Sequence, residues 1–185
     1  MTLARKLAGG LAMVLASMAA ASGCASAQQA PLIREYRIGV LAHDVPGLWS
    51  GFRLERGVDA NVELILSPSV DFLGGSIRPA IGGSFNLSGY TSKAYIDARW
   101  MYEAPAGWFV GLGIGAALHD GVLDPTEIDR KALGRRVLFH FPLEVGYRID
   151  GHHTVSLYFD HMSNAYTTTY NEGLDTLGVR YGYKF

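Results

Sequence analysis

The sequence predicts an all-β protein, an eight-stranded antiparallel transmembrane β-barrel. Apolar residues recur at every second position in eight separate segments, which is the periodicity of strands with one apolar face. Most segments run for about ten residues or more, the length of a tilted strand that crosses a bilayer. Glycine is abundant, with 23 of 185 residues, and 49% of the residues are hydrophobic. Together these features favour a barrel over a helical membrane protein.

Each predicted strand is defined by its alternating apolar positions. The first four segments are 35–43, 58–67, 76–87 and 91–102, with apolar faces that start at Tyr36, Val58, Ile77 and Ala94. The last four are 108–118, 136–149, 154–163 and 174–185, with apolar faces that start at Trp108, Val137, Val155 and Leu177. Turn and loop residues separate all of them, so we expect successive strands to pair as antiparallel neighbours.

The opposite faces of these segments carry charges of both signs. They hold Glu35, Arg37, Asp59, Glu63, Arg78, Lys93, Asp97, Arg99, Arg136, Glu144, Arg148, Asp160, Arg180 and Lys184. A soluble sandwich with a solvated face would show the same alternation. Aromatic residues near the strand ends favour the membrane alternative: Trp100, Tyr102, Trp108, Tyr181, Tyr183 and Phe185. In an eight-stranded barrel the charged side chains fill the interior as a polar plug.

The first 27 residues are interpreted as a cleaved secretory signal peptide, which leaves residues 28–185 as a single barrel domain. Arg5 and Lys6 form the positive start, an apolar stretch follows, and Ala25-Ser26-Ala27 supplies a small-x-small cleavage site. Ser22-Gly23-Cys24 also fits part of a lipoprotein motif, so lipidation of Cys24 is an alternative. Beyond Cys24 the chain has no cysteine and therefore no disulfide framework.

Net charge, hydropathy and loop lengths further limit the class of protein that the sequence predicts. The formal net charge is −1 and no basic patch is present, so no nucleic-acid partner is expected. After the signal no stretch approaches 18 continuous apolar residues, and no transmembrane helix is predicted. With a periplasmic N-terminus, the outer connections are 44–57, 88–90, 119–135 and 166–173. Three of these four are longer than most inner turns, as is typical of outer-membrane barrels.

A polar group interrupts the apolar pattern near the C-terminus. His161 and Ser163 continue the outward-facing stripe of segment 154–163, and Asp175 has the outward parity of the last segment. Antiparallel pairing would bring Asp175 opposite Ser163 or His161, on the outside of the barrel. These side chains suit a hydrolase in which Ser163 is the nucleophile, His161 the base and Asp175 the orienting acid. Asn164 could stabilise the oxyanion through its backbone N–H or its side-chain amide. The alternative is that the strands simply enter the polar interface here.

The same residues carry a resemblance to a known family. His161-x-Ser163-Asn164-Ala165, followed by Asn171-x-Gly173-Leu174-Asp175, resembles the active-site hairpin of the PagL-type lipid A 3-O-deacylases. A looser likeness extends upstream through segments 78–89 and 136–139. The resemblance implies that His161 and Ser163 match the family's histidine and serine. The family's acid is usually glutamate, and Asp175 occupies its position with a stem one methylene shorter. Glu172 is the alternative acid.

The resemblance also implies a substrate and a location. It implies hydrolysis of the ester-linked 3-hydroxyacyl chain at position 3 of lipid A, in the outer membrane, without a metal or organic cofactor. The partners would be lipid A or lipopolysaccharide and the surrounding outer-membrane lipids. Two alternatives stay open: a non-catalytic barrel for adhesion or envelope stability, and a hydrolase of acyloxyacyl or phospholipid esters. The sequence leaves the oligomeric state open, a homodimer included.

Overall fold

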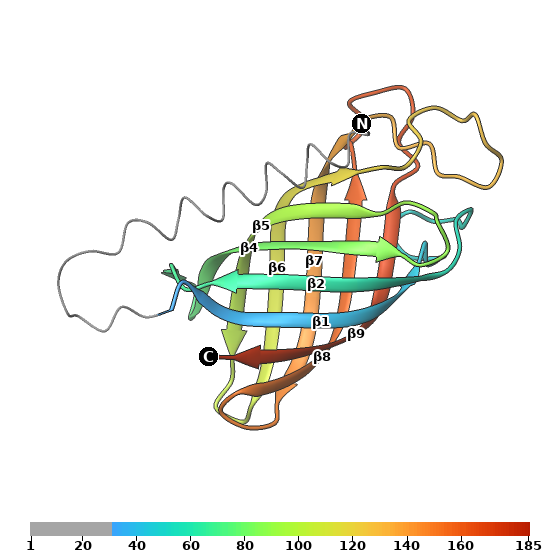
Figure 1. Cartoon of the computed structure of the whole chain (residues 1–185). Helices are drawn as coiled ribbons and strands as arrows, with labels where there is room; N and C mark the ends of the chain where they lie inside the picture. Colours follow the sequence, from blue (N-terminus) through green and yellow to red (C-terminus); the bar gives the residue numbers. More distant parts are fainter. Residues whose placement is uncertain (1–30) are drawn as a thin grey trace, which may run out of the picture. The chain divides into compact units, whose positions relative to one another are not determined.

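The computed structural model describes residues 31–185, which form one barrel (Figure 1). The predicted signal peptide, residues 1–27, lies outside the described residues. The strands are β1 (Ile33–His43), β2 (Val58–Leu66), β3 (Val70–Phe72), β4 (Gly75–Asn86), β5 (Lys93–Glu103), β6 (Trp108–His119), β7 (Val137–Arg148), β8 (His153–Ser163) and β9 (Leu174–Lys184). Within residues 31–185 no helix is long and apolar enough to cross a membrane.

Strand pairing closes the sheet into a ring and confirms the predicted eight-stranded antiparallel barrel. β1 pairs with β2 on one side and with β9 on the other. β2 pairs with β4, and each strand from β4 to β9 pairs with the next. β3 is a short addition that pairs only with the start of β4, and it lies in the connection between the predicted segments 58–67 and 76–87. The barrel wall is therefore made of eight strands, and β3 extends it at one end.

Burial alternates along the wall as the sequence pattern predicts. Outward apolar residues such as Val40, Ile96 and Leu157 are exposed, because they face the surroundings of the barrel. Most of the predicted inward charges are buried. Arg136 is a correction: it is exposed, and its guanidinium donates to the carbonyl of Gly121. It precedes the first residue of β7, so it lies in the connecting loop and not in the barrel interior.

The barrel interior is a packed network of ion pairs. Glu144 on β7 accepts hydrogen bonds from Arg37, from Arg99 at 2.8 Å and from Arg180 at 2.6 Å. Glu63 on β2 pairs with two of these arginines, Arg99 and Arg180. Charges taken out of water are tolerated only when they are paired and hydrogen-bonded, and this network meets that condition.

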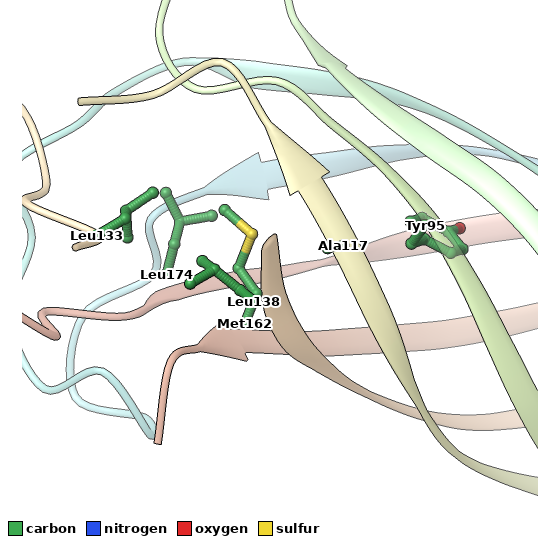
Figure 2. Packing of buried hydrophobic residues seen from close by; sticks show 6 residues of the cluster. All are labelled: Tyr95, Ala117, Leu133, Leu138, Met162 and Leu174. Carbon is green, nitrogen blue, oxygen red and sulfur yellow. The ribbon is translucent and has the colours of Figure 1, made fainter. Parts of the chain in front are cut away.

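An apolar cluster closes the interior near the long loops. Its members are Tyr95, Ala117, Leu133, Leu138, Met162 and Leu174. Figure 2 shows Leu133, Leu138, Met162 and Leu174 gathered together, with Tyr95 further along the barrel. Met162 and Leu174 are paired across β8 and β9, and both are fully buried. Neighbouring residues on a strand face opposite sides, so the residues next to this buried pair, His161 on β8 and Asp175 on β9, point outward and lie opposite each other.

The long loops lie at one end of the barrel and the aromatic residues concentrate at the other. Residues 44–57, 120–136 and 164–173 connect the strands at the end away from the C-terminus (Figure 1). At the opposite end Tyr36 stacks on Tyr183, with ring centroids 5.7 Å apart. Trp108 packs against Tyr147 at the same end. The aromatic residues thus form a girdle at the end with short turns, which in such barrels faces the periplasm.

Candidate active site

His161, Ser163 and Asp175 meet on the outer wall of the barrel. His161 on β8 is opposite Asp175 on β9, one of the two partners that parity allowed. The Nδ1 atom of His161 lies 2.6 Å from Oδ1 of Asp175, and its Nε2 atom lies 2.9 Å from Oγ of Ser163. The shorter aspartate stem therefore reaches the imidazole. One side chain bridges a hydroxyl and a carboxylate, with both contacts at hydrogen-bond distance.

The chemistry of these contacts fixes the direction of each hydrogen bond. An ionised carboxylate only accepts hydrogen bonds, so the Nδ1–H of His161 donates to Asp175. In a neutral imidazole the other nitrogen is then an acceptor, and the hydroxyl of Ser163 donates to Nε2. This is the arrangement in which an imidazole can remove a proton from a serine hydroxyl.

The three side chains are buried although they face outward. The exposed fraction is 4% for His161, 8% for Ser163 and 0% for Asp175. The loop 44–57 covers them: Trp49 stacks on His161, and the backbone N–H of Ser50 donates to Oδ2 of Asp175 at 2.7 Å. The sequence predicted a site directly at the lipid-facing surface. The loop was not predicted as its cover, because it has no strand periodicity that would show where it folds.

Hydrogen bonds from neighbouring loops hold this covering loop. Glu55 accepts bonds from Nε2 of His43, from the N–H and hydroxyl of Thr91 and from the N–H of Lys131. Burial alone would raise the pKa of Glu55, but these hydrogen bonds outweigh it and hold the pKa at about 2. The ammonium of Lys131 donates to the carbonyl of Phe52 at 2.6 Å. The position of loop 44–57 therefore depends on loop 120–136.

Glu172, the alternative acid, is used elsewhere. Its Oε2 atom accepts the N–H of Ala132 at 2.6 Å, and its own N–H donates to the carbonyl of Ala132. These bonds tie loop 164–173 to loop 120–136. Of the two candidate carboxylates, Asp175 is the one at hydrogen-bond distance from His161.

Asn164 organises the loop that follows Ser163. Its N–H donates to Oδ1 of Asn171 at 2.8 Å, and its side-chain amide donates to the carbonyls of Leu133 and Tyr170 and to the hydroxyl of Thr168. Both the backbone N–H and the side-chain amide of Asn164, the two groups that could donate to an oxyanion, are therefore already hydrogen-bonded to loop residues. The predicted oxyanion role thus requires Asn164 to exchange a loop partner for the substrate.

A cavity lies beside this group, and a separate groove lies nearer the end of the barrel with short turns. A cavity of about 340 Å³ opens above His161 and Ser163, between loops 44–57 and 164–173, with Trp49, Tyr166 and Tyr170 in its lining. A groove of about 890 Å³ lies further along the wall on β1, β6, β7, β8 and β9, with an almost wholly apolar lining. A polar mouth and an apolar wall suit an amphipathic substrate.

The fold and the site together define a class of protein: an outer-membrane β-barrel enzyme with an ester-hydrolase arrangement of side chains. The family model for lipid A 3-O-deacylase (PagL) matches residues 46–184. The chain belongs to this family, and it is accordingly an ester hydrolase of the outer membrane that acts on lipid A. This confirms the family that the closing hairpin indicated.

Solved structures agree with the fold. The crystal structure of the outer membrane enzyme PagL is similar with a TM-score of 0.60 and 18% identity, covering 80% of this chain and 99% of that one. Neisserial surface protein A is similar with a TM-score of 0.52 and 11% identity, covering 85% of this chain and 100% of that one. No curated protein matches the chain in sequence.

Proposed function

We propose that the chain removes the ester-linked 3-hydroxyacyl group at position 3 of lipid A through a triad of Ser163, His161 and Asp175. The observation that carries the proposal is the continuous contact from the carboxylate through the imidazole to the hydroxyl, at 2.6 and 2.9 Å. All three side chains come from one chain, so the reaction needs no second copy.

The reaction proceeds in two halves. The Oγ atom of Ser163 attacks the ester carbonyl carbon while its proton passes to Nε2 of His161, and Asp175 stabilises the resulting imidazolium. The tetrahedral intermediate then expels the sugar oxygen, which takes the proton from Nε2 and leaves an acyl group on Ser163. Water attacks this acyl-enzyme with His161 as the base, and release of the 3-hydroxy fatty acid regenerates the Ser163 hydroxyl.

The oxyanion of each tetrahedral intermediate needs hydrogen-bond donors. We propose Asn164 as a contributor, because its backbone N–H follows Ser163 directly in the chain. Its N–H becomes available when Asn171 releases it. Binding of the ester in the neighbouring cavity would favour that exchange, since Asn171 also lines the cavity.

The surroundings of the triad support a lipid substrate. The polar cavity beside Ser163 suits a sugar headgroup, and the outward apolar wall suits acyl chains that remain in the bilayer. The ester bond of such a lipid lies at the boundary between the two. A hydrolase site at this depth reaches the ester without drawing the chains out of the membrane.

The test is mass spectrometry of lipid A from cells that express the protein or its Ser163→Ala variant. Lipid A should lose the mass of one 3-hydroxyacyl group with the unaltered protein only. Unchanged lipid A with a correctly inserted barrel would favour the non-catalytic alternative. Release of a non-hydroxylated fatty acid would instead indicate an acyloxyacyl or phospholipid ester as the substrate. Heat-modifiable migration on a gel verifies that both proteins are folded.

A further inference from the structure

Trp49 in loop 44–57 lies flat against the imidazole of His161. The two ring centroids are 4.3 Å apart and the ring planes differ by 10°. Phe141 on β7 packs against the same pair, 5.4 Å from Trp49 and 6.4 Å from His161. His161 is consequently 4% exposed, whereas Trp49 itself is 63% exposed. The indole thus covers the imidazole without being part of a packed core.

We propose that Trp49 is a positioning residue for His161, supplied by a loop far from β8 and β9 in the sequence. The inference rests on the proposed function. In each half of the reaction His161 becomes an imidazolium, and the face of an indole attracts a cation held against it. The stack also restricts rotation of the imidazole about its Cβ–Cγ bond. Trp49 therefore stabilises the charged form of His161 and keeps Nε2 directed at Ser163.

The loop keeps its path independently of Trp49. Asp44 accepts the N–H groups of Leu54 and Glu55 at 2.7 and 2.9 Å. Lys131 holds the carbonyl of Phe52, and its ammonium lies 3.8 Å from the centre of the Phe52 ring. None of these anchors uses the indole of Trp49. Replacing Trp49 should therefore remove the stack and leave the loop in place.

A spectroscopic test needs no catalytic activity. The chain has three tryptophans, so Trp100→Phe with Trp108→Phe leaves Trp49 as the only indole. A protonated imidazole in contact with an indole quenches its fluorescence, so emission should fall as His161 takes up a proton. The step should vanish in the same protein carrying His161→Gln. The other titratable groups that face the pair are Asp175, Glu172, Tyr166 and Tyr170, and all of them remain in that control.

Either of two results would overturn the inference: emission that does not change with pH, or an identical step in the His161→Gln protein. Both outcomes concern the stack alone. They are independent of the lipid A measurement on Ser163→Ala, so failure of the inference and failure of the proposed function are distinguishable.

The kinetic test separates positioning from substrate binding and from anchoring in the membrane interface. Trp49→Leu should lower kcat by about ten-fold with KM changed much less, since the imidazolium forms only during the reaction. Trp49→Phe should recover most of the activity. Trp100→Leu is the matched control, because Trp100 stacks on Tyr102 near the end of β5 at the opposite end of the barrel and lines neither the cavity nor the groove. A raised KM with unchanged kcat, or an equal loss in Trp100→Leu, would contradict the positioning role.

Discussion

Gly173 lies directly against the imidazole of His161. Its backbone has a φ of +62°, and a Cβ at this position would meet Cε1 of His161 at 3.0 Å. Gly173→Ala should therefore displace the imidazole and lower kcat by at least ten-fold, in addition to about 1 kcal/mol of backbone strain. Gly89→Ala is the control, because Gly89 has a φ of +82° with nothing within 4 Å. Comparable loss of activity in both variants would show that strain, and not contact with His161, is responsible.

Asp175 is held from two sides, which makes its charge directly testable. Its Oδ1 accepts from His161 and its Oδ2 accepts the N–H of Ser50. Asp175→Asn keeps the shape but offers an N–H where His161 needs an acceptor, so we expect kcat to fall by roughly 10⁴. Asp175→Glu restores the charge and should retain part of the activity. Full activity in Asp175→Asn, measured by fatty acid release, would exclude Asp175 from the triad.

Much of this architecture follows from the recurrence of apolar residues at every second position along the strands. The alternation gave the strands to within one or two residues and the side of the wall on which each residue lies. Parity also put His161, Ser163 and Asp175 on one outer face. Only the choice of partner stayed open, because a slip of the loop register would exchange His161 for Ser163 opposite Asp175.

Contacts made by the loops could not be predicted in the same way. Ser50 and Asp175 are 125 residues apart, and a loop without periodicity does not reveal where it folds. The stacking of Trp49 on His161 and the hydrogen bond from the N–H of Lys131 to Glu55 could not be predicted for the same reason. In the barrel interior the sequence identified the charged residues but not their pairs, because strand tilt brings Arg37, Arg99 and Arg180 from separate strands to one carboxylate.

Glu144 is the point on which this interior network depends. Glu144→Gln should lower the free energy of unfolding by about 3 kcal/mol, because three buried arginines lose their shared negative charge. The change in the free energy of unfolding is measured by urea titration in detergent, with the folded fraction read from heat-modifiable migration on a gel. Glu103→Gln is the control: its side chain is 31% exposed and pairs with Arg148, so the expected cost is below about 1 kcal/mol. Equal stability of the two variants would contradict this account of the interior.

Asn164 provides a test of loop order against oxyanion stabilisation. Asn164→Ala removes the side-chain hydrogen bonds to Leu133, Tyr170 and Thr168, each worth about 0.5–1.5 kcal/mol. The two carbonyls keep a second donor each, the N–H of Arg135 and the hydroxyl of Thr168, so the cost is that of the lost bonds alone. We expect loop 164–173 to open and to be cut faster by trypsin-like or chymotrypsin-like proteases. A loop that stays protected while kcat falls by about 10² or more would instead identify the side-chain amide as an oxyanion donor.

Glu55 makes closure of loop 44–57 dependent on pH. Its pKa is about 2 in the closed loop, below the ordinary 4.5, so closure is favoured by the charged form. The stabilisation is complete above pH 4.5 and is lost as the pH falls towards 2, with a size on the order of 3 kcal/mol. Backbone hydrogen exchange of loop 44–57, corrected for the intrinsic effect of pH on exchange, measures the opening. Protection of the loop should fall between pH 4.5 and 2, and Glu55→Gln should be weakly protected at every pH. Unchanged protection down to pH 2 would show that other contacts, such as those of Lys131, hold the loop without Glu55.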